Sequence, residues 1–366
     1  MLRLAASVPP QVVARMSSAQ VADPVERPAA VAGRVGRVPR HLTFDEAIAA
    51  VRTREQLRAS GMTARAIGDA VGRGELRRLQ RNRYVGVKLW NDLWPESRHL
   101  IEVCAAVAEM RDGDGVASHE SAGVLAELPL YRHTPSAVHL LKPEARRGSS
   151  RVGLQHHADL LPRDDITVVN GIRCTTLDRT VFDLVRTLSM EAAVAVADAA
   201  LRREAMRGSE YDERAADAWR ERMLRRCEAA RGGRGVRQAE VVIRFADGRS
   251  ESPGEAVSRL QLSRLGFREL RLQVPVPGPD GRTFRVDIGL EEVRSFYEFD
   301  GMGKYEELAV ASGKTVKEVL LEEKRREDWI RGTTQRRLGR AEAPHIVSPE
   351  ALGRRLTAFG ITPPRR

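Results

Sequence analysis

The chain is poor in cysteine and lacks any long apolar run. Its three cysteines, Cys104, Cys174 and Cys227, are odd in number and far apart among 366 residues. The sequence therefore predicts neither a disulfide framework nor a thiolate zinc site, and a reducing cytoplasm fits this pattern. No stretch approaches the roughly 18 apolar residues of a membrane span, so we expect no membrane partner.

The first forty residues also lack a continuous apolar block, since they mix proline, alanine, valine and arginine. This composition is not typical of a secretory signal. We expect residues 1–40 to be a disordered tail, or an upstream start that precedes a second one near Met16.

Basic residues are abundant. The formal net charge is +11 and the pI is near 10.1, which favours a polyanionic partner such as double-stranded DNA. The alternative is an arginine-rich composition imposed by a GC-rich genome. The length predicts two or three domains, each with its own core.

Residues 41–90 have the pattern of a winged helix-turn-helix. Thr43, Thr53 and Thr63 are placed to cap three short helices, and two strand-like runs follow at 76–79 and 81–85. Six arginines are the predicted DNA contacts of this module: Arg65, Arg73, Arg77, Arg78, Arg81 and Arg83. The alternative is a small helical domain with an arginine-coated surface.

Residues 91–207 read as an α+β middle domain with a binding or scaffolding role. Short strands are expected at 137–141 and 152–155, and Asn170-Gly171 predicts a hairpin because both residues tolerate positive φ. The next stretch, 208–248, is arginine-rich and predicts a helix end and linker, which either faces water or lies against DNA.

Five histidines fall in the middle region: His119, His133, His139, His156 and His157. They lack the i, i+4 helical spacing or the Cys-x-x-Cys companion of a zinc site. We therefore expect surface or packing histidines.

Residues 249–366 predict a mixed α/β domain with a central sheet. Ser252-Pro-Gly-Glu255 can cap its first helix. A strand at 270–276 and a hairpin follow, then a helix at 314–331, a short strand at 345–347 and a closing helix at 349–356.

The hairpin, residues 284–305, carries the acidic residues that we expect to matter. Glu298 and Asp300 are two apart on one strand, so they share a face. If the turn has an even length, for instance with Leu290 opposite Val293, Asp287 lies across from Phe296 and joins them; an odd turn sends it to the other face.

Three converging carboxylates suit a hard cation such as Mg²⁺, for which Mn²⁺ can substitute. With Lys304 stabilising the transition state, the set fits phosphodiester hydrolysis. The alternative is a solvated hairpin with an acidic wet face.

The core of the hairpin, Asp287, Glu298-Phe-Asp300-Gly301 and Lys304-Tyr305, resembles the PD-(D/E)XK nuclease superfamily, in the branch similar to very-short-patch-repair endonucleases. Two flanking segments extend the match: Glu251-Ser-Pro-Gly-Glu255 with Arg259 before the hairpin, and Glu323-Lys-Arg-Arg-Glu-Asp328 after it. The resemblance implies a restriction-endonuclease-like fold in which Asp287 and Glu298 bind metal and Glu255 is an auxiliary acid. Asp300 stands where the superfamily usually has lysine, so Lys304 or Lys324 has to replace it. Glu255 can instead be a cap.

Residues 53–84, with Ser60-Gly-Met-Thr63 and Arg73-Gly-Glu-Leu-Arg-Arg-Leu79, resemble the winged helix of AbiEi-type antitoxins from type IV toxin-antitoxin systems. The run from Thr176 to Asp183 is similar to the middle domain of that family. The resemblance implies operator binding and a toxin partner. Two functions remain open: a DNA endonuclease, or a non-enzymatic repressor whose nuclease fold is inactive.

Overall fold

The computed structural model describes residues 39–108, 110, 115–141, 152–301 and 313–364. It is a mixed α/β protein in two compact units, one ending at Leu188 and the other beginning at Ser189. The predicted middle domain, 91–207, is thus divided between them. Lys304 and residues 1–38 lie outside the described residues. Among the residues described, no helix has both the length and the apolar character needed to cross a membrane.

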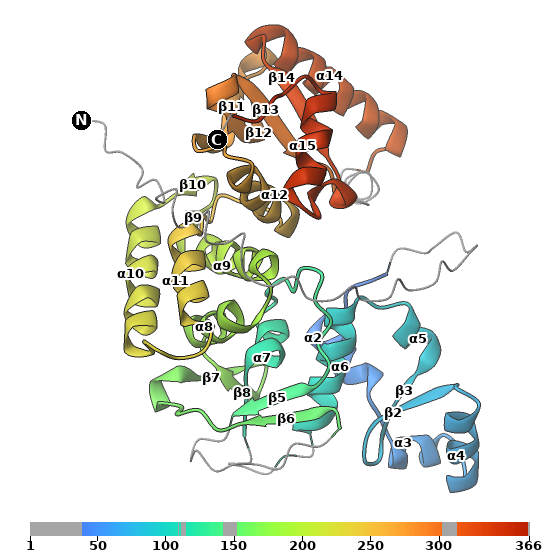
Figure 1. Ribbon diagram of the computed structural model, residues 1–366. Helices are drawn as coiled ribbons and strands as arrows, with labels where there is room; N and C mark the ends of the chain where they lie inside the picture. The colour runs from blue at the N-terminus through green and yellow to red at the C-terminus, as the bar shows by residue number, and fades with distance from the viewer. Residues whose placement is uncertain (1–38, 109, 111–114, 142–151, 302–312, 365–366) are drawn as a thin grey trace. The chain divides into compact units, whose positions relative to one another are not determined.

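The first unit begins with three short helices and a small antiparallel sheet of order β1-β3-β2 (Figure 1). Each helix begins at one of the predicted threonines, whose hydroxyl accepts a hydrogen bond from the first turn. The elements are α2 (Phe44–Ala50), β1 (Arg52–Thr53), α3 (Arg54–Ala59), α4 (Ala64–Gly72), β2 (Leu76–Gln80) and β3 (Arg83–Gly86). Leu57, Ile67 and Tyr84 form the core that fixes α4 against β3.

A five-stranded sheet of order β6-β5-β4-β8-β7 completes this unit. The hairpin at Asn170-Gly171 is confirmed, since both residues have positive φ, 48° and 78°. The strands are β4 (Val116–Ala117), β5 (Val138–Leu141), β6 (Leu154–His157), β7 (Ile166–Val169) and β8 (Ile172–Thr175), and the helices are α5 (Val87–Asn91), α6 (Pro95–Val107), α7 (His119–Leu125) and α8 (Leu177–Thr187).

The second unit opens with helices. These are α9 (Met190–Ala205), α10 (Glu213–Ala229), α11 (Val236–Phe245) and α12 (Pro253–Arg264), with a small hairpin of β9 (Met206–Arg207) and β10 (Glu210–Tyr211). The helix expected within 208–248 is present, as α10 and α11, but the expected linker is wrong for most of that stretch, because Trp219 and Met223 are fully buried and make α10 part of the core.

A buried ion pair holds α9 to α12. Both oxygens of Asp198 lie 2.9 Å from a guanidinium nitrogen of Arg259, and both side chains are almost fully buried. Ser250 Oγ and the amide of Asp247 also donate to Asp198. Arg259 therefore pairs with α9 and not with Glu255, one turn before it on its own helix.

The unit ends in a four-stranded sheet of order β11-β12-β13-β14, in which only the β13–β14 pairing is parallel. Its strands are β11 (Leu270–Pro277), β12 (Thr283–Leu290), β13 (Ser295–Phe299) and β14 (Arg337–Ala341), followed by α15 (Pro349–Ala358); α14 (Val316–Thr334) lies between β13 and β14 in sequence. The strand predicted at 345–347 is wrong, since Ala343–Ile346 form a 3₁₀ turn.

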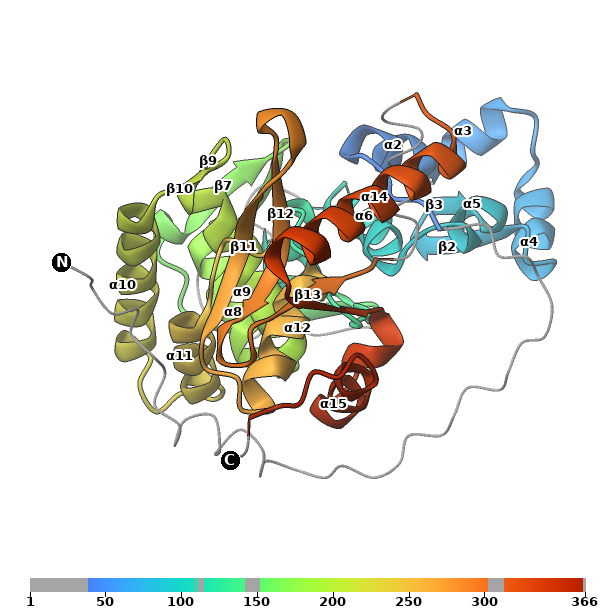
Figure 2. The ribbon, with the colours of Figure 1, turned by 90° about the horizontal axis from the view of Figure 1, so that it is seen from above.

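Helices cover both faces of this sheet (Figure 2). Ser258 on α12 hydrogen-bonds the hydroxyl of Tyr297, whereas Arg326 on α14 reaches Glu298. Neighbouring residues of a strand point to opposite faces, so α12 and α14 pack on opposite sides of β13.

Candidate functional site

The turn between β12 and β13 sets the register of the acidic residues. Four residues, 291–294, separate Leu290 from its partner Ser295, and they include a 3₁₀ turn that ends with Arg294 at φ 46°. An even length is one of the two alternatives that the sequence left open, but the register given as its example is wrong, because Phe296 pairs with Gly289. The ladder ends with Ile288 opposite Tyr297, and continuing it by one residue puts Asp287 opposite Glu298.

Residues opposite each other on antiparallel strands share a face, so Asp287 and Glu298 lie on the same side of the sheet. Asp287 Oδ2 accepts a hydrogen bond from the amide of Phe299, at 2.9 Å. That bond ties the carboxylate to the end of β13.

Glu298 is neutralised by two arginines of the chain. Its side chain is only 7% exposed, and its oxygens lie 2.6 Å from Arg326 and 3.2 Å from Arg340. Arg326 comes from α14 and also donates to the carbonyl of Arg285. The two guanidinium groups thus stand beside the carboxylate at the distances of direct ion pairs.

The same arginines gather further acids into what we call the acid–arginine cluster. Its members are Glu298, Asp300, Glu323, Glu327, Arg326 and Arg340. Burial lowers the pKa of Arg340, but the nearby carboxylates, Glu298 first, outweigh it and raise that pKa above its usual value. Burial also lowers the pKa of Arg326, but its hydrogen bond to Glu298 and the acids around it raise that pKa above the usual value as well. Both arginines are therefore held as cations.

Glu255 has the contacts of a helix cap. One oxygen accepts from the amide of Glu251 at 2.8 Å and the other from Ser252 Oγ at 3.0 Å. Gln273 on β11 also donates to it, at 3.3 Å. The neighbouring Gly254 lets the ring of Phe299 pack against the start of α12, because a Cβ there would lie 2.0 Å from that ring.

These carboxylates do not fit a Mg²⁺ ion in the arrangement described. Magnesium needs oxygen ligands converging at about 2.1 Å, whereas both oxygens of Glu298 face guanidinium groups and one oxygen of Asp287 accepts from an amide. Asp300 lies 3.8 Å from Arg340. Among the described residues, three metal-binding side chains with their ligand atoms within 4.8 Å of one another occur only in a histidine group.

The predicted DNA-binding arginines fall into two groups. Arg73 pairs with Glu75 at 2.8 Å, Arg77 lies over the ring of Trp90 and near Glu102, and Arg83 donates to the carbonyl of Ala108. These three are held by contacts inside the chain.

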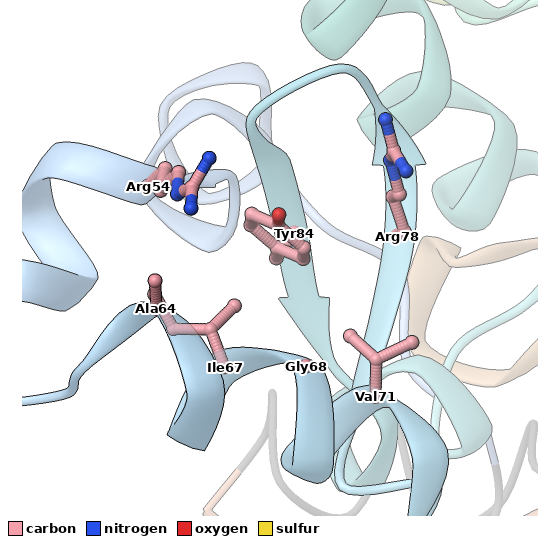
Figure 3. Close-up of a pocket in the computed structure, with 7 residues that line it drawn as sticks. All are labelled: Arg54, Ala64, Ile67, Gly68, Val71, Arg78 and Tyr84. Carbon is pink, nitrogen blue, oxygen red and sulfur yellow. The ribbon is translucent and has the colours of Figure 1, made fainter.

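The remaining arginines are exposed. Within the described part of the chain, Arg65 and Arg81 make no ion pair, and Arg78 donates only to the carbonyl of Gln80. Arg78 also lines a hollow of about 220 Å³ between α4 and the β2–β3 hairpin. Figure 3 shows Arg54 and Arg78 on either side of Tyr84 there.

Three basic residues of these sites escaped the sequence analysis. Arg54 begins α3 and precedes the stretch where arginines are dense. Arg326 lies in the stretch 323–328, which the resemblance included without giving this residue a role, and Arg340 belongs to a strand that was not anticipated. The acidic residues of the hairpin were the available signal for these arginines, because a buried carboxylate requires a cation beside it.

No family model matches the sequence. The chain is 31% identical over 166 residues to two proteins of Mycobacterium tuberculosis, strains CDC 1551 and H37Rv, both named as uncharacterized. The similarity covers 45% of this chain and 56% of each relative, so the chain spans little more than half the length of the proteins it matches.

Proposed function

We propose that the protein is a DNA-binding regulator. In this proposal residues 41–90 form a winged helix-turn-helix, and residues 249–366 form a restriction-endonuclease-like domain that serves binding and not hydrolysis. The resemblance to AbiEi-type antitoxins supports repression of its own operon and a toxin partner. The three free, buried cysteines support a reducing compartment such as the cytoplasm.

The order of elements supports the N-terminal part of the proposal. Two helices, α3 and α4, are joined by a tight turn at Gly61, with φ 91°, and a hairpin follows directly. A helix-turn-helix places its second helix in the major groove, and that helix is α4 here.

The observation that carries the proposal is a set of exposed arginines that form no ion pair with any acid among the described residues. Arg65 lies on α4, Arg78 on β2, Arg81 at the hairpin tip and Arg54 on α3. Cations that are not neutralised by the protein can neutralise phosphates and release counterions, which strengthens binding to DNA.

A salt titration tests this. DNA from upstream of the gene is labelled, and binding is followed by fluorescence anisotropy at several salt concentrations. We expect the double variant Arg65→Ala/Arg81→Ala to bind more weakly and to reduce the salt slope by about two, roughly one for each arginine that no longer neutralises a phosphate.

The matched control is Arg73→Ala/Arg77→Ala, which removes the same charge from arginines that already have partners. We expect a smaller change in the slope. An equal effect of the two double variants contradicts the assignment, because total charge and not position then controls binding.

The acid–arginine cluster argues against metal-dependent hydrolysis by the C-terminal domain. In a metal-dependent nuclease the cation beside the carboxylates is the metal ion, whereas here Arg326 and Arg340 supply the positive charge next to Glu298.

The second candidate is Mg²⁺-dependent phosphodiester hydrolysis. One observation favours it: Asp287 precedes Ile288, which pairs with Tyr297, and so faces Glu298. The test is nicking of supercoiled plasmid with Mg²⁺ or Mn²⁺. Nicking that Asp287→Asn abolishes, while the variant unfolds at the same urea concentration as the parent, establishes hydrolysis; equal cutting by both proteins excludes these residues from it.

A further inference from the structure

Three histidines that are far apart in sequence meet beside the five-stranded sheet. β5 and β6 are parallel, with Leu141 opposite His157 and His139 opposite Gln155. Since every second residue of a strand shares a face, His139 and His157 lie on one face and His156 on the other. His139 Nδ1 is 2.9 Å from His157 Nε2.

The third ring comes from the start of α7, which Figure 1 draws next to β5. The rings of His119 and His157 are stacked, with centroids 3.9 Å apart. Two hydrogen bonds fix this geometry: the amide of Ser118 donates to the carbonyl of His139, and the amide of His139 donates to Ser121 Oγ. Each ring can offer one nitrogen, and these three atoms lie within 4.8 Å of one another.

Glu120 holds the outer side of this group. One of its oxygens lies 2.7 Å from His139 Nε2 and the other 2.8 Å from His133 Nε2. Because Nε2 of His139 is engaged with a carboxylate, its Nδ1 is the nitrogen that faces the other rings. A carboxylate behind a histidine is the usual support of a metal-binding imidazole.

The backbone at His119 has φ 49°, a region that residues other than glycine rarely adopt. Such strain persists where the surrounding structure holds it, and it is concentrated at functional sites. Here the strained residue is one that supplies a ring to the group.

We propose that His119, His139 and His157 bind a divalent transition-metal ion, with Glu120 positioning His139 and the fourth ligand position open to water. Three imidazoles suit zinc and its neighbours in the first row. Zinc–nitrogen distances of about 2.0–2.1 Å require ligand nitrogens roughly 3.3 Å apart, so His139 and His157 separate by a few tenths of an ångström. The proposal is independent of the DNA-binding function.

The test is calorimetric titration of tag-free, metal-stripped protein with zinc chloride. We expect one zinc per chain in the parent protein and a loss of at least tenfold in affinity for His157→Gln, whose ring is only partly buried. Glu120→Gln is expected to lose about 10- to 100-fold, the usual range for a residue that supports a ligand.

His156→Gln is the matched control, because it changes the adjacent histidine on the opposite face of β6, and it should bind zinc as the parent does. Cobalt gives a second readout: the parent protein with Co²⁺ should show the visible bands of a tetrahedral site, and His157→Gln should not. Absence of one-equivalent zinc binding in the folded parent protein, or equal affinity of His157→Gln and His156→Gln, overturns the proposal.

Discussion

The acid–arginine cluster and the histidine group are two polar clusters that differ in whether the chain itself supplies the positive charge. Around Glu298 the chain supplies its own positive charge, through Arg326 and Arg340. In the histidine group it supplies three imidazole rings, and the carboxylate of Glu120 lies behind His139.

The difference teaches that residue type alone does not predict a metal site. Carboxylates are good ligands for hard ions, but two guanidinium groups compete with the ion for the same oxygens. Histidines from three separate elements have no sequence motif, yet a parallel strand pair brings them together.

The largest effect is expected when Glu298 is removed. Glu298→Ala removes the carboxylate that both Arg326 and Arg340 contact, and the two arginines are largely buried. We therefore expect it to lower the free energy of unfolding by about 3–5 kcal/mol. The measurement is urea denaturation. Glu269→Ala, at an exposed position, is the control and should stay within about 0.5 kcal/mol. A loss below about 1 kcal/mol for Glu298→Ala would show that the arginines do not depend on it.

A smaller effect is expected at the histidine group. Glu120→Gln replaces a carboxylate that accepts from two histidines, and we expect a loss of about 1–3 kcal/mol in the absence of metal. The measurement is thermal and urea unfolding, with the exposed Asp69→Asn as control. Equal stability of Glu120→Gln and Asp69→Asn would mean that Glu120 does not hold the rings.

Removing an arginine should make the acidic cluster resemble a metal site. Arg340→Met takes a cation away from four carboxylates. We expect Mg²⁺ to stabilise this variant more than the parent, by about 1.4 kcal/mol when Mg²⁺ is ten times its Kd. Arg336→Met, which frees only Glu291, is the control. A strong response of the parent protein itself would show that its cluster is already open to the ion.

The smallest effect is expected on the rate at which Cys104 and Cys174, in the unit that holds the histidine group, are alkylated. Burial raises the pKa of Cys104 and of Cys174 to about 11. Since the thiolate reacts, alkylation at pH 8 should be slow and should rise about tenfold per pH unit toward pH 11. The rate of an exposed thiol, with a pKa of about 8.5, instead levels off above that pH. Mass spectrometry measures the alkylation rate. Bound zinc should lower this rate further, because a ligand that binds the folded form stabilises it. Fast labelling of either cysteine at pH 8 would contradict the burial.

Local signals were predicted well. Helix caps and tight turns depend on contacts within four residues, so the local sequence is sufficient to predict them. This holds for the threonines that begin α2, α3 and α4 and for the Asn170-Gly171 turn. The Ser252 cap was found for the same reason, with its contacts to Glu255.

Pairings between distant segments were not predicted. The strand at 337–341 contains two arginines and a glycine, which are poor indicators of a strand, and its parallel pairing with β13 brings Arg340 beside Glu298. The histidines became a group only through the pairing of β5 with β6 and the attachment of α7 to β5.

The sequence alone determined the mixed α/β class, the helix starts and the turns, because capping and turn chemistry depend on neighbouring residues. Tertiary structure alone decided which charges meet, because electrostatic contacts depend on distance in space and not along the chain. It paired Arg326 and Arg340 with Glu298, one of the predicted acids. It also brought three histidines that share no motif close enough together to bind one ion.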